Sequence, residues 1–177
     1  MCLVATVPLT VQAQQPKPAT PPAKTPPPQS EKSFTVHPIG SVQNVEGRTM
    51  IVLDKKYEKG LLGLEHWSHV QVIWWFDRND TPQKRAILQV HPRGNPNNPL
   101  TGVFACRAPV RPNLIALSLC KVVSVKDNVV EIDKIDAIEG TPVLDLKPYT
   151  PGNDRAMKVK VPDWTKTKGS QNERREP

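Results

Sequence analysis

The sequence predicts a mainly β fold, in which the strands close into a barrel with long loops. Between Phe34 and Val125, apolar residues recur with period two or in short β-branched runs, as they do in strands. Apart from a short possibility between Lys59 and Trp67, no stretch has the helical spacing of about 3.6 residues, and no segment repeats. The 177 residues have room for one domain with an ordinary core.

The strand candidates begin with an alternating segment that carries Phe34, Val36 and Val42. The run from Val70 to Phe76 is long and apolar on both faces, which is typical of a central strand. A hairpin is expected where VVSV turns back into VVEIDKI across the polar residues Lys126–Asn128. The other expected strands are Met50–Leu53, Ala86–Val90 and Leu114–Val125.

The segment from His91 to Asn113 is too rich in Pro, Gly and Asn for regular structure over most of its length. Loops of that size in compact domains are usually functional. Guanidinium groups form paired hydrogen bonds with carboxylates or phosphates. The polar side chains here therefore suit a ligand with an amino-acid end, a ribose or a nucleotide. The alternative is a solvated loop with surface salt bridges. The polar residues of this cluster are His91, Arg93, Arg107, Arg111, Asn113 and Ser118.

A second polar cluster lies in Glu139–Tyr149, where a Gly-Thr-Pro turn leads into a short strand. Asp145, Lys147 and Tyr149 alternate there and are expected to share one face of the strand. Asp145 could balance a cation, Lys147 could orient it or bind an anion, and Tyr149 could stack or hydrogen-bond. The alternative is an outward strand surface, with the apolar residues of the strand facing the core.

Composition marks off both ends of the chain. Residues 14–32 contain no aromatic residue and no Ile, Leu or Val, so we expect a disordered, polyproline-like linker. Before it, residues 1–13 are apolar and end in small side chains, as a signal peptide does, but lack its basic start. They are either a truncated leader or a chance hydrophobic stretch, and they are too short to span a membrane. The barrel domain is expected over residues 33–164, followed by a basic disordered tail at 165–177.

The formal charge of +7 is carried mainly by the two ends of the chain. Residues 1–32 hold three basic groups and one acidic group, residues 155–177 hold seven and three, and the rest of the chain holds fourteen and thirteen. A basic tail can contact phosphates, and a solvated, disordered end is the alternative.

Other kinds of site find little support in the sequence. Cys106 and Cys120 are fourteen positions apart with no C-x-x-C pair, which argues against a zinc cluster. Export would allow a Cys106–Cys120 disulfide, and two unpaired thiols fit equally well. His66 and His69 would face opposite sides of a strand, so no metal site is expected. Dinucleotide-binding, Walker, zinc-protease and nucleophile-elbow motifs are absent.

A series of ordered segments resembles one known family. The segments are Pro38-Ile-Gly40, LLGLEHWSHV at Leu61–Val70, His91-Pro-Arg93, Gly102–Ala105, RAPVRPN at Arg107–Asn113 and GTPVLDLKPY at Gly140–Tyr149. The last of them is the most specific. On these residues the chain resembles the TsaA-like family, which implies a single-sheeted β-barrel that is commonly a homodimer and binds S-adenosylmethionine.

The resemblance also implies an activity. The family's enzyme methylates N6 of the threonylcarbamoyl-modified adenosine next to the tRNA anticodon, so tRNA would be the partner. Asp145 and Tyr149 are the expected catalytic residues. Asp145 would be the charge partner or base, and Tyr149 or Ser118 would contact the adenine or ribose edge. The residues expected to bind the cofactor are His91, Arg93, Arg107, Arg111, Asn113, Ser118 and Lys147.

Three positions depart from the family's usual loop pattern, R-S-P-x-R-P-N-P-I-G-L-S. Ala108, Leu114 and Ala116 replace serine, proline and glycine, which removes one hydroxyl group and adds a Cβ near the expected ligand. These changes and the leader support an alternative function, an exported barrel that binds a small ligand or a partner protein without methyl transfer. Its location would be exported or periplasmic if the leader is real, and cytoplasmic if it is not.

Overall fold

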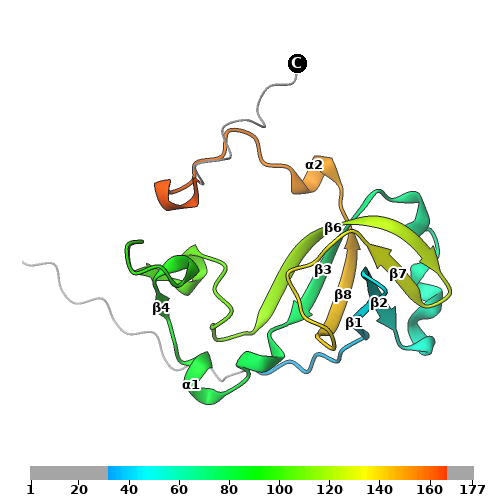
Figure 1. Cartoon of the computed structure of the whole chain (residues 1–177), viewed down its shortest axis with the longest axis horizontal. Coiled ribbons are helices and arrows are strands. Elements are labelled where there is room, and N and C mark those ends of the chain that lie inside the picture. The colour runs from blue at the N-terminus through cyan, green and yellow to red at the C-terminus, as the bar shows by residue number, and fades with distance from the viewer. Residues whose placement is uncertain (1–31, 167–177) are drawn as a thin grey trace, which may run out of the picture. The chain divides into compact units, whose positions relative to one another are not determined.

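Six antiparallel strands close into a barrel in the computed structural model of the chain, which describes residues 32–166 (Figure 1). Around the barrel the order is β1-β2-β7-β6-β3-β8, and β8 pairs with β1. The expected leader, nearly all of the linker and most of the basic tail lie outside the described residues. The barrel strands are β1 (Gly40–Val45), β2 (Arg48–Leu53), β3 (His69–Trp75), β6 (Ile115–Lys126), β7 (Val129–Ile132) and β8 (Pro142–Pro148).

Short elements fill the connections. The helical possibility near Lys59–Trp67 is a pair of 3-10 turns, and β4 and β5 form a separate two-stranded sheet. The α1 turn begins where Thr81 accepts a hydrogen bond from the Lys84 backbone and Pro82 opens the helix. The elements are η1 (Lys55–Leu61), η2 (Leu64–His66), η3 (Asp77–Asn79), α1 (Pro82–Arg85), β4 (Gln89–Val90), η4 (Pro92–Gly94), β5 (Thr101–Gly102), η5 (Val103–Ala105), α2 (Pro151–Asp154) and η6 (Asp163–Thr165).

The β1–β2 hairpin explains the glycine of the Pro-Ile-Gly segment. Gly40 pairs with Leu53, and a Cβ on Gly40 would lie 2.2 Å from the carbonyl oxygen of Val52. Any side chain at this position would therefore push the two strands apart. At the other end of the hairpin, Glu46 and Gly47 have φ of 51° and 77°, as a tight two-residue turn requires.

β3 lies between β6 and β8, and its side chains alternate between the barrel interior and the outer face. Inward side chains from all six strands fill the interior, as in other small barrels. The expected central strand is therefore part of a continuous wall around an apolar core. The inward residues are Val42, Ile51, Leu53, Val70, Val72, Trp74, Ala116, Cys120, Val130, Ile132 and Val143.

β6 is paired unevenly along its two edges. On one edge, Ile115–Lys121 pair with β3. On the other edge, β6 meets β7 only from Val122 onward. The first half of β6 therefore has an open edge within the described chain, beside the loop that precedes it and the segment that follows β7.

Two of the expected strands are wrong in extent. Val36 is exposed, and the first strand begins only at Gly40, where β2 and β8 supply hydrogen-bonding partners. Within Ala86–Val90, only Gln89–Val90 forms a strand, because Ala86 caps the α1 turn and the Ile87 backbone donates to the Lys84 carbonyl oxygen. The other expected strands are confirmed, as is the Lys126–Asn128 hairpin, whose central Asp127 has a φ of 53°.

Both cysteines of the barrel domain are free thiols. Cys120 is buried in the core, and this burial, with a smaller contribution from the charge of Asp133, raises the pKa of its thiol to about 11. Within residues 32–166, no group of three or more His, Cys, Asp and Glu side chains is placed to hold a metal ion. None of the helices described here has the length and apolar character needed to cross a membrane.

Candidate functional site

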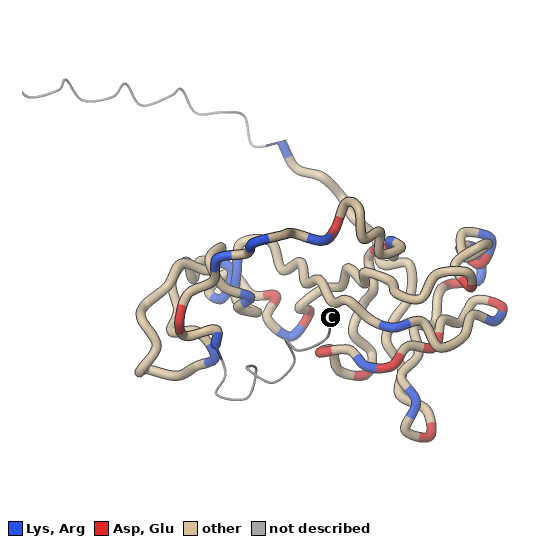
Figure 2. The backbone as a smooth tube through the Cα atoms, turned by 90° about the horizontal axis from the view of Figure 1, so that it is seen from above, with Lys and Arg blue, Asp and Glu red and all other residues tan. Residues whose placement is uncertain are grey.

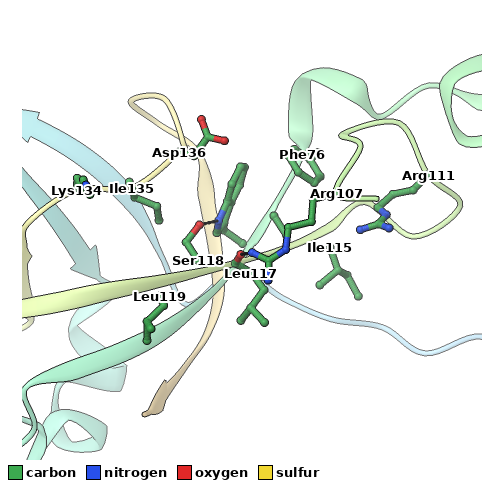
Figure 3. A pocket seen from close by; sticks show the side chains of 12 residues that line it. Phe76, Arg107, Arg111, Ile115, Leu117, Ser118, Leu119, Lys134, Ile135 and Asp136 are labelled. Atoms are coloured by element: carbon green, nitrogen blue, oxygen red, sulfur yellow. Dashed lines mark hydrogen bonds between the residues drawn. The ribbon is translucent and has the colours of Figure 1, made fainter. Parts of the chain in front are cut away.

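A cavity of about 610 Å³ opens at the unpaired edge of β6. On one side lies the arginine loop, which we define as residues 107–113, and on the other lies Lys134–Asp136, between β7 and β8 (Figure 3). We call this cavity the edge cavity. Residues 115–119 of β6 line it, so a ligand there would lie against strand backbone as well as side chains.

Two aromatic side chains line the edge cavity from β3 and its end. The rings of Trp74 and Phe76 meet edge to face, with centroids 4.6 Å apart. Trp74 is 6% exposed, and its Nε1 donates a hydrogen bond of 3.0 Å to the Ser118 hydroxyl group on β6 (Figure 3). Ser118, expected to bind the cofactor, thus lines the cavity and also holds the Trp74 ring in place.

Arg107 is the polar residue common to the cavities of this region. Its Nη1 donates to the Leu117 carbonyl oxygen on the open edge of β6, at 3.4 Å. A guanidinium carries five N–H groups, so donors remain for an anionic ligand. Arg107 lines the edge cavity and two neighbouring ones, which makes it the best placed of the expected cofactor-binding residues.

A smaller recess of about 310 Å³ adjoins the edge cavity. The two share Trp74, Phe76, Arg107 and Asp136, so they form one continuous site. The recess adds charged side chains of both signs from the turn after β3, which are Asp77 and Arg78. The whole site therefore offers guanidinium groups, carboxylates and aromatic faces within one hollow.

The sequence did not point to Lys134, Asp136, Asp77 or Arg78. The second polar cluster expected from the sequence begins at Glu139, three positions after Asp136. A usable signal is present, because charged residues follow β7 directly and β3 after the single residue Phe76, and loops at strand ends often carry functional side chains. Only the barrel closure brings these two strand ends together.

The arginine loop is braced from within by Arg111. Its Nη2 donates to the carbonyl oxygens of Val103, at 2.7 Å, and Cys106, at 3.4 Å. These bonds close the loop onto the η5 turn. Arg111 lines the edge cavity, but part of its hydrogen-bonding capacity holds the loop.

A second brace comes from α1. Arg85 donates through Nε to the Asp80 carboxylate at 2.7 Å and through Nη1 to the carbonyl oxygen of Pro112 at 2.8 Å. The guanidinium also lies 5.3 Å from the centre of the Trp75 ring, whose Nε1 donates to Asp80 at 3.1 Å. The hydrogen bonds from Arg85 and then from Trp75 hold the pKa of the Asp80 carboxyl group below its usual range.

His91 and Arg93 line a different cavity, of about 820 Å³, which we call the loop cavity. His91 Nδ1 donates to the Asn98 carbonyl oxygen at 2.7 Å, which shapes this part of the loop. Arg93 has a φ of 61°, in the left-handed backbone region that residues other than glycine rarely adopt. The structure therefore separates His91 and Arg93 from the edge cavity, and Arg107 connects the two.

The β8 residues lie on the outer wall of the barrel. Lys147 Nζ is 2.8 Å from the Asp145 carboxylate, and this hydrogen-bonded ion pair raises the pKa of Lys147. Tyr149 packs edge to face with His69, with centroids 6.3 Å apart. The one-sided alternation expected for Asp145 and Lys147 is thus present, but none of the three cavities above is lined by these residues or by the exposed Asn113.

The three departures from the family pattern have different surroundings. Leu114 is fully buried, and Ala116 belongs to the barrel core, where its methyl group packs with other inward residues. Ala108 lines the loop cavity. Two of the three changes therefore add apolar volume at the start of β6, and Ala116 does so at the inner wall of the edge cavity.

The barrel domain is similar to known proteins. Residues 30–155 fit the family model described as the tRNA-methyltransferase O N-terminal domain. The probable S-adenosyl-L-methionine-binding protein of Methanocaldococcus jannaschii is 43% identical over 117 residues, which are 66% of this chain and 93% of that protein. The human tRNA (adenine(37)-N6)-methyltransferase is 42% identical over 105 residues, which are 59% of this chain and 23% of that protein.

The fold is also found in solved structures. A crystal structure of TrmO from Pseudomonas aeruginosa superposes with a TM-score of 0.60 at 27% identity, covering 76% of this chain and 63% of that one. The chain thus spans less than two thirds of TrmO and under a quarter of the human enzyme. The closed β-barrel expected from the sequence is confirmed. Because the family model matches well over half of its residues, the chain belongs to the family of the tRNA-methyltransferase O N-terminal domain, whose members are the TsaA-like proteins.

Proposed function

We propose that the protein binds S-adenosylmethionine in the edge cavity and its adjoining recess, and transfers the methyl group to N6 of an adenosine in tRNA. The observation that carries the proposal is the combination of Arg107, Asp136 and the Trp74–Phe76 pair in one continuous hollow. The names of the archaeal and human relatives, which refer to S-adenosylmethionine binding and to adenine methylation, support it. They do not support the alternative of an exported barrel without methyl transfer.

The side chains present fit the chemistry of this cofactor. Its carboxylate matches the guanidinium groups of Arg107 and Arg78, which can bind it through paired N–H donors. Its ammonium group matches the carboxylates of Asp77 and Asp136. The adenine ring is planar and largely apolar at its faces, and suits the aromatic pair and the leucine side chains of β6.

The bound cofactor supplies an electrophilic methyl group, and the protein has to align the acceptor and remove a proton from its amine. Two carboxylates are candidates for holding that proton. Asp145 is the base proposed from the sequence, and its carboxylate lies 2.8 Å from Lys147 Nζ on the barrel wall. Asp136 is already in the cavity wall, which makes it the alternative.

The direct test is calorimetric titration of the full chain with S-adenosylmethionine. We expect saturable binding, and we expect Arg107→Ala to weaken it by about tenfold or more, as the loss of a charged hydrogen bond of about 1.5–3 kcal/mol implies. The matched control is Arg48→Ala, which removes an exposed arginine whose nearest carboxylates belong to Glu46 and Glu131. No heat of binding at millimolar cofactor would refute the proposal.

We further propose that the protein is a homodimer. Four apolar side chains of β6 are about half exposed, and three of them occupy successive outward positions, which is unusual for a strand surface. Leu117 and Leu119 also line the edge cavity, so a second copy on this face would help to enclose it. Light scattering should give twice the chain mass, and Leu119→Glu should give the monomer mass. The exposed residues are Ile115, Leu117, Leu119 and Val123.

A further inference from the structure

The loop cavity is placed beside the edge cavity and is not needed to explain cofactor binding. Arg107 lines both of them. A transfer reaction requires the donor and the acceptor side by side, so a second hollow that shares a wall with the first is where the acceptor fits best. The loop cavity, at about 820 Å³, has the volume of a nucleotide-sized site.

The residues that line the loop cavity indicate which kind of ligand it can bind. Most of it is apolar, from prolines, valines and alanines of the loop segments. Its basic side chains are His91, Arg93 and Arg107, Thr165 adds a hydroxyl group, and among the described residues that line it none is acidic. Trp164 adds an aromatic wall. A planar ligand that carries negative charge matches these features, and a nucleotide has both parts.

Trp164 reaches the cavity from the far end of the chain. It lies in the η6 turn, which is held by a hydrogen bond of 2.6 Å from Thr165 Oγ1 to the Pro162 carbonyl oxygen. A weaker contact of 3.5 Å joins Arg93 Nη2 to the Thr165 carbonyl oxygen. Trp164 is half-buried, whereas the residues before it are exposed, so the turn is the point where this segment attaches to the loop.

The segment that leads to Trp164 is strongly basic. Residues 155–166, which we call the strap, hold four Lys and Arg side chains and one acidic residue, Asp163. Figure 2 shows this run of basic positions along the exposed chain that leaves the barrel after α2. A row of exposed cations that ends at an aromatic ring is the arrangement with which proteins bind single-stranded nucleic acid, through phosphates and one stacked base.

We propose that the loop cavity takes one nucleobase from a single-stranded loop of RNA, stacked on Trp164, while the neighbouring phosphates contact Arg93 and the strap. The left-handed backbone of Arg93 supports this, since strain of that kind is kept where it aims a side chain at a ligand. The inference rests on the proposed function, because it assigns the acceptor to this cavity and the cofactor to the edge cavity. It predicts two binding sites that can be impaired separately.

The test compares Trp164→Ala and Trp164→Phe in the full chain. The probe is a fluorescein-labelled RNA hairpin of the size of a tRNA anticodon arm, and binding is followed by anisotropy at fixed salt. We expect Trp164→Ala to raise the Kd by about fivefold or more, the lower end for loss of one stacked base, and Trp164→Phe to restore most of the affinity. The matched control, Trp67→Ala, removes an exposed tryptophan that does not line the cavity, and should leave the Kd unchanged.

Two further measurements separate the possible failures. Polyphosphate, which has no base to stack, should bind Trp164→Ala and the wild type equally, and an equal loss for polyphosphate and RNA would refute the stacking. The Kd for S-adenosylmethionine should be the same in Trp164→Ala and the wild type. Absence of cofactor binding in the wild type would refute the proposed function, whereas no RNA binding up to about 100 μM, the weak end of sequence-independent affinity, would refute this inference.

Discussion

Arg85 donates a hydrogen bond of 2.8 Å from Nη1 to the carbonyl oxygen of Pro112, which joins α1 to the arginine loop. Neither residue lines the edge cavity or its recess. Pro112 lies directly between Arg111 and Asn113, so this bond fixes the loop from outside. The conformation of the site therefore depends on a side chain that touches no ligand, and this dependence can be tested.

Arg85→Ala should loosen the arginine loop and weaken the binding of S-adenosylmethionine by about fivefold, which corresponds to roughly 1 kcal/mol for one lost hydrogen bond. Arg85→Lys should rescue little, because an ammonium group cannot bond both Asp80 and Pro112 in the geometry of a fork. Titration calorimetry gives the Kd. The control is Lys55→Ala, which removes an exposed side chain on η1. A wild-type Kd in Arg85→Ala would show that the loop holds its shape without the brace.

The same brace predicts a pH dependence of stability. The pKa of Asp80 is lowered in the folded state from 3.8, first by the hydrogen bond from Arg85 and then by that from Trp75. A lowered pKa stabilises the fold above the unfolded-state pKa, and this stabilisation is lost as the pH falls through the folded-state value. Asp80→Asn should therefore melt at a lower temperature than the wild type at pH 7, and the difference should vanish in acid.

Thermal melts of both proteins across the acid range measure this difference. Asp54→Asn serves as the control. The Asp54 carboxylate is exposed, and its distance of 4.0 Å from Lys56 Nζ makes the ion pair a weak one. A gap between wild type and Asp80→Asn that stays constant down to pH 2 would contradict the assignment, because protonation should remove it.

The two candidate carboxylates can be told apart by separate readouts. Asp136→Asn should raise the Kd for S-adenosylmethionine by about tenfold, as expected when one charged contact in the cavity wall is lost. If Asp145 is the base, Asp145→Ala should abolish methyl transfer while circular dichroism shows a folded barrel, since the side chain is on the outer wall. Unchanged turnover in Asp145→Ala would remove this residue from the mechanism and leave Asp136 as the base.

The two thiols of the barrel should differ in reactivity. Cys120 is 1% exposed and has its pKa raised to about 11 by burial, so almost none of it is thiolate at pH 8. Cys106 is half-buried, with Sγ 3.6 Å from the Gly102 carbonyl oxygen. In a Cys2→Ser background, a thiol reagent should label Cys106 in the folded protein and Cys120 only after unfolding. Equal labelling rates for the two would contradict the burial of Cys120.

Ala116 tests whether a departure from the family pattern serves packing. Ala116→Gly should lower the free energy of unfolding by about 0.5–1 kcal/mol, the cost of glycine within a strand. Leu114→Ala should cost about 2–5 kcal/mol, because the leucine is fully buried. Urea melts measure both. If titration calorimetry shows tighter cofactor binding in Ala116→Gly, the Ala116 methyl group obstructs the ligand instead.

The periodic parts of the fold were predictable from the sequence. Val70–Phe76 and Leu114–Val125 could be recognised as strands because alternating burial leaves a period of two in the residues themselves. The Lys126–Asn128 turn could be recognised because a polar turn between β-branched runs is a local signal. The strand predicted from Phe34 and Val36 is wrong there, because these residues alternate with polar ones but have no partner strand.

The candidate site was only partly predictable. Arg107, Arg111 and Ser118 do line the edge cavity, because a proline-rich arginine loop is visible in the sequence. Asp136 and Arg78 were missed, since their importance comes from the loops at the ends of β7 and β3 meeting across the barrel. The roles of Asp145, Lys147 and Tyr149 stay predictions.

The residues alone establish the family, the β-rich class and the arginine-bearing loop, because motifs and short-range periodicity are written in consecutive positions. Only the tertiary structure decides the rest: that the first half of β6 keeps an open edge, that Arg107 lies between two cavities, and that Trp164 lines the second of them. These relations join residues that lie far apart along the chain. They depend on strand register and on where pairing stops, which no local pattern specifies.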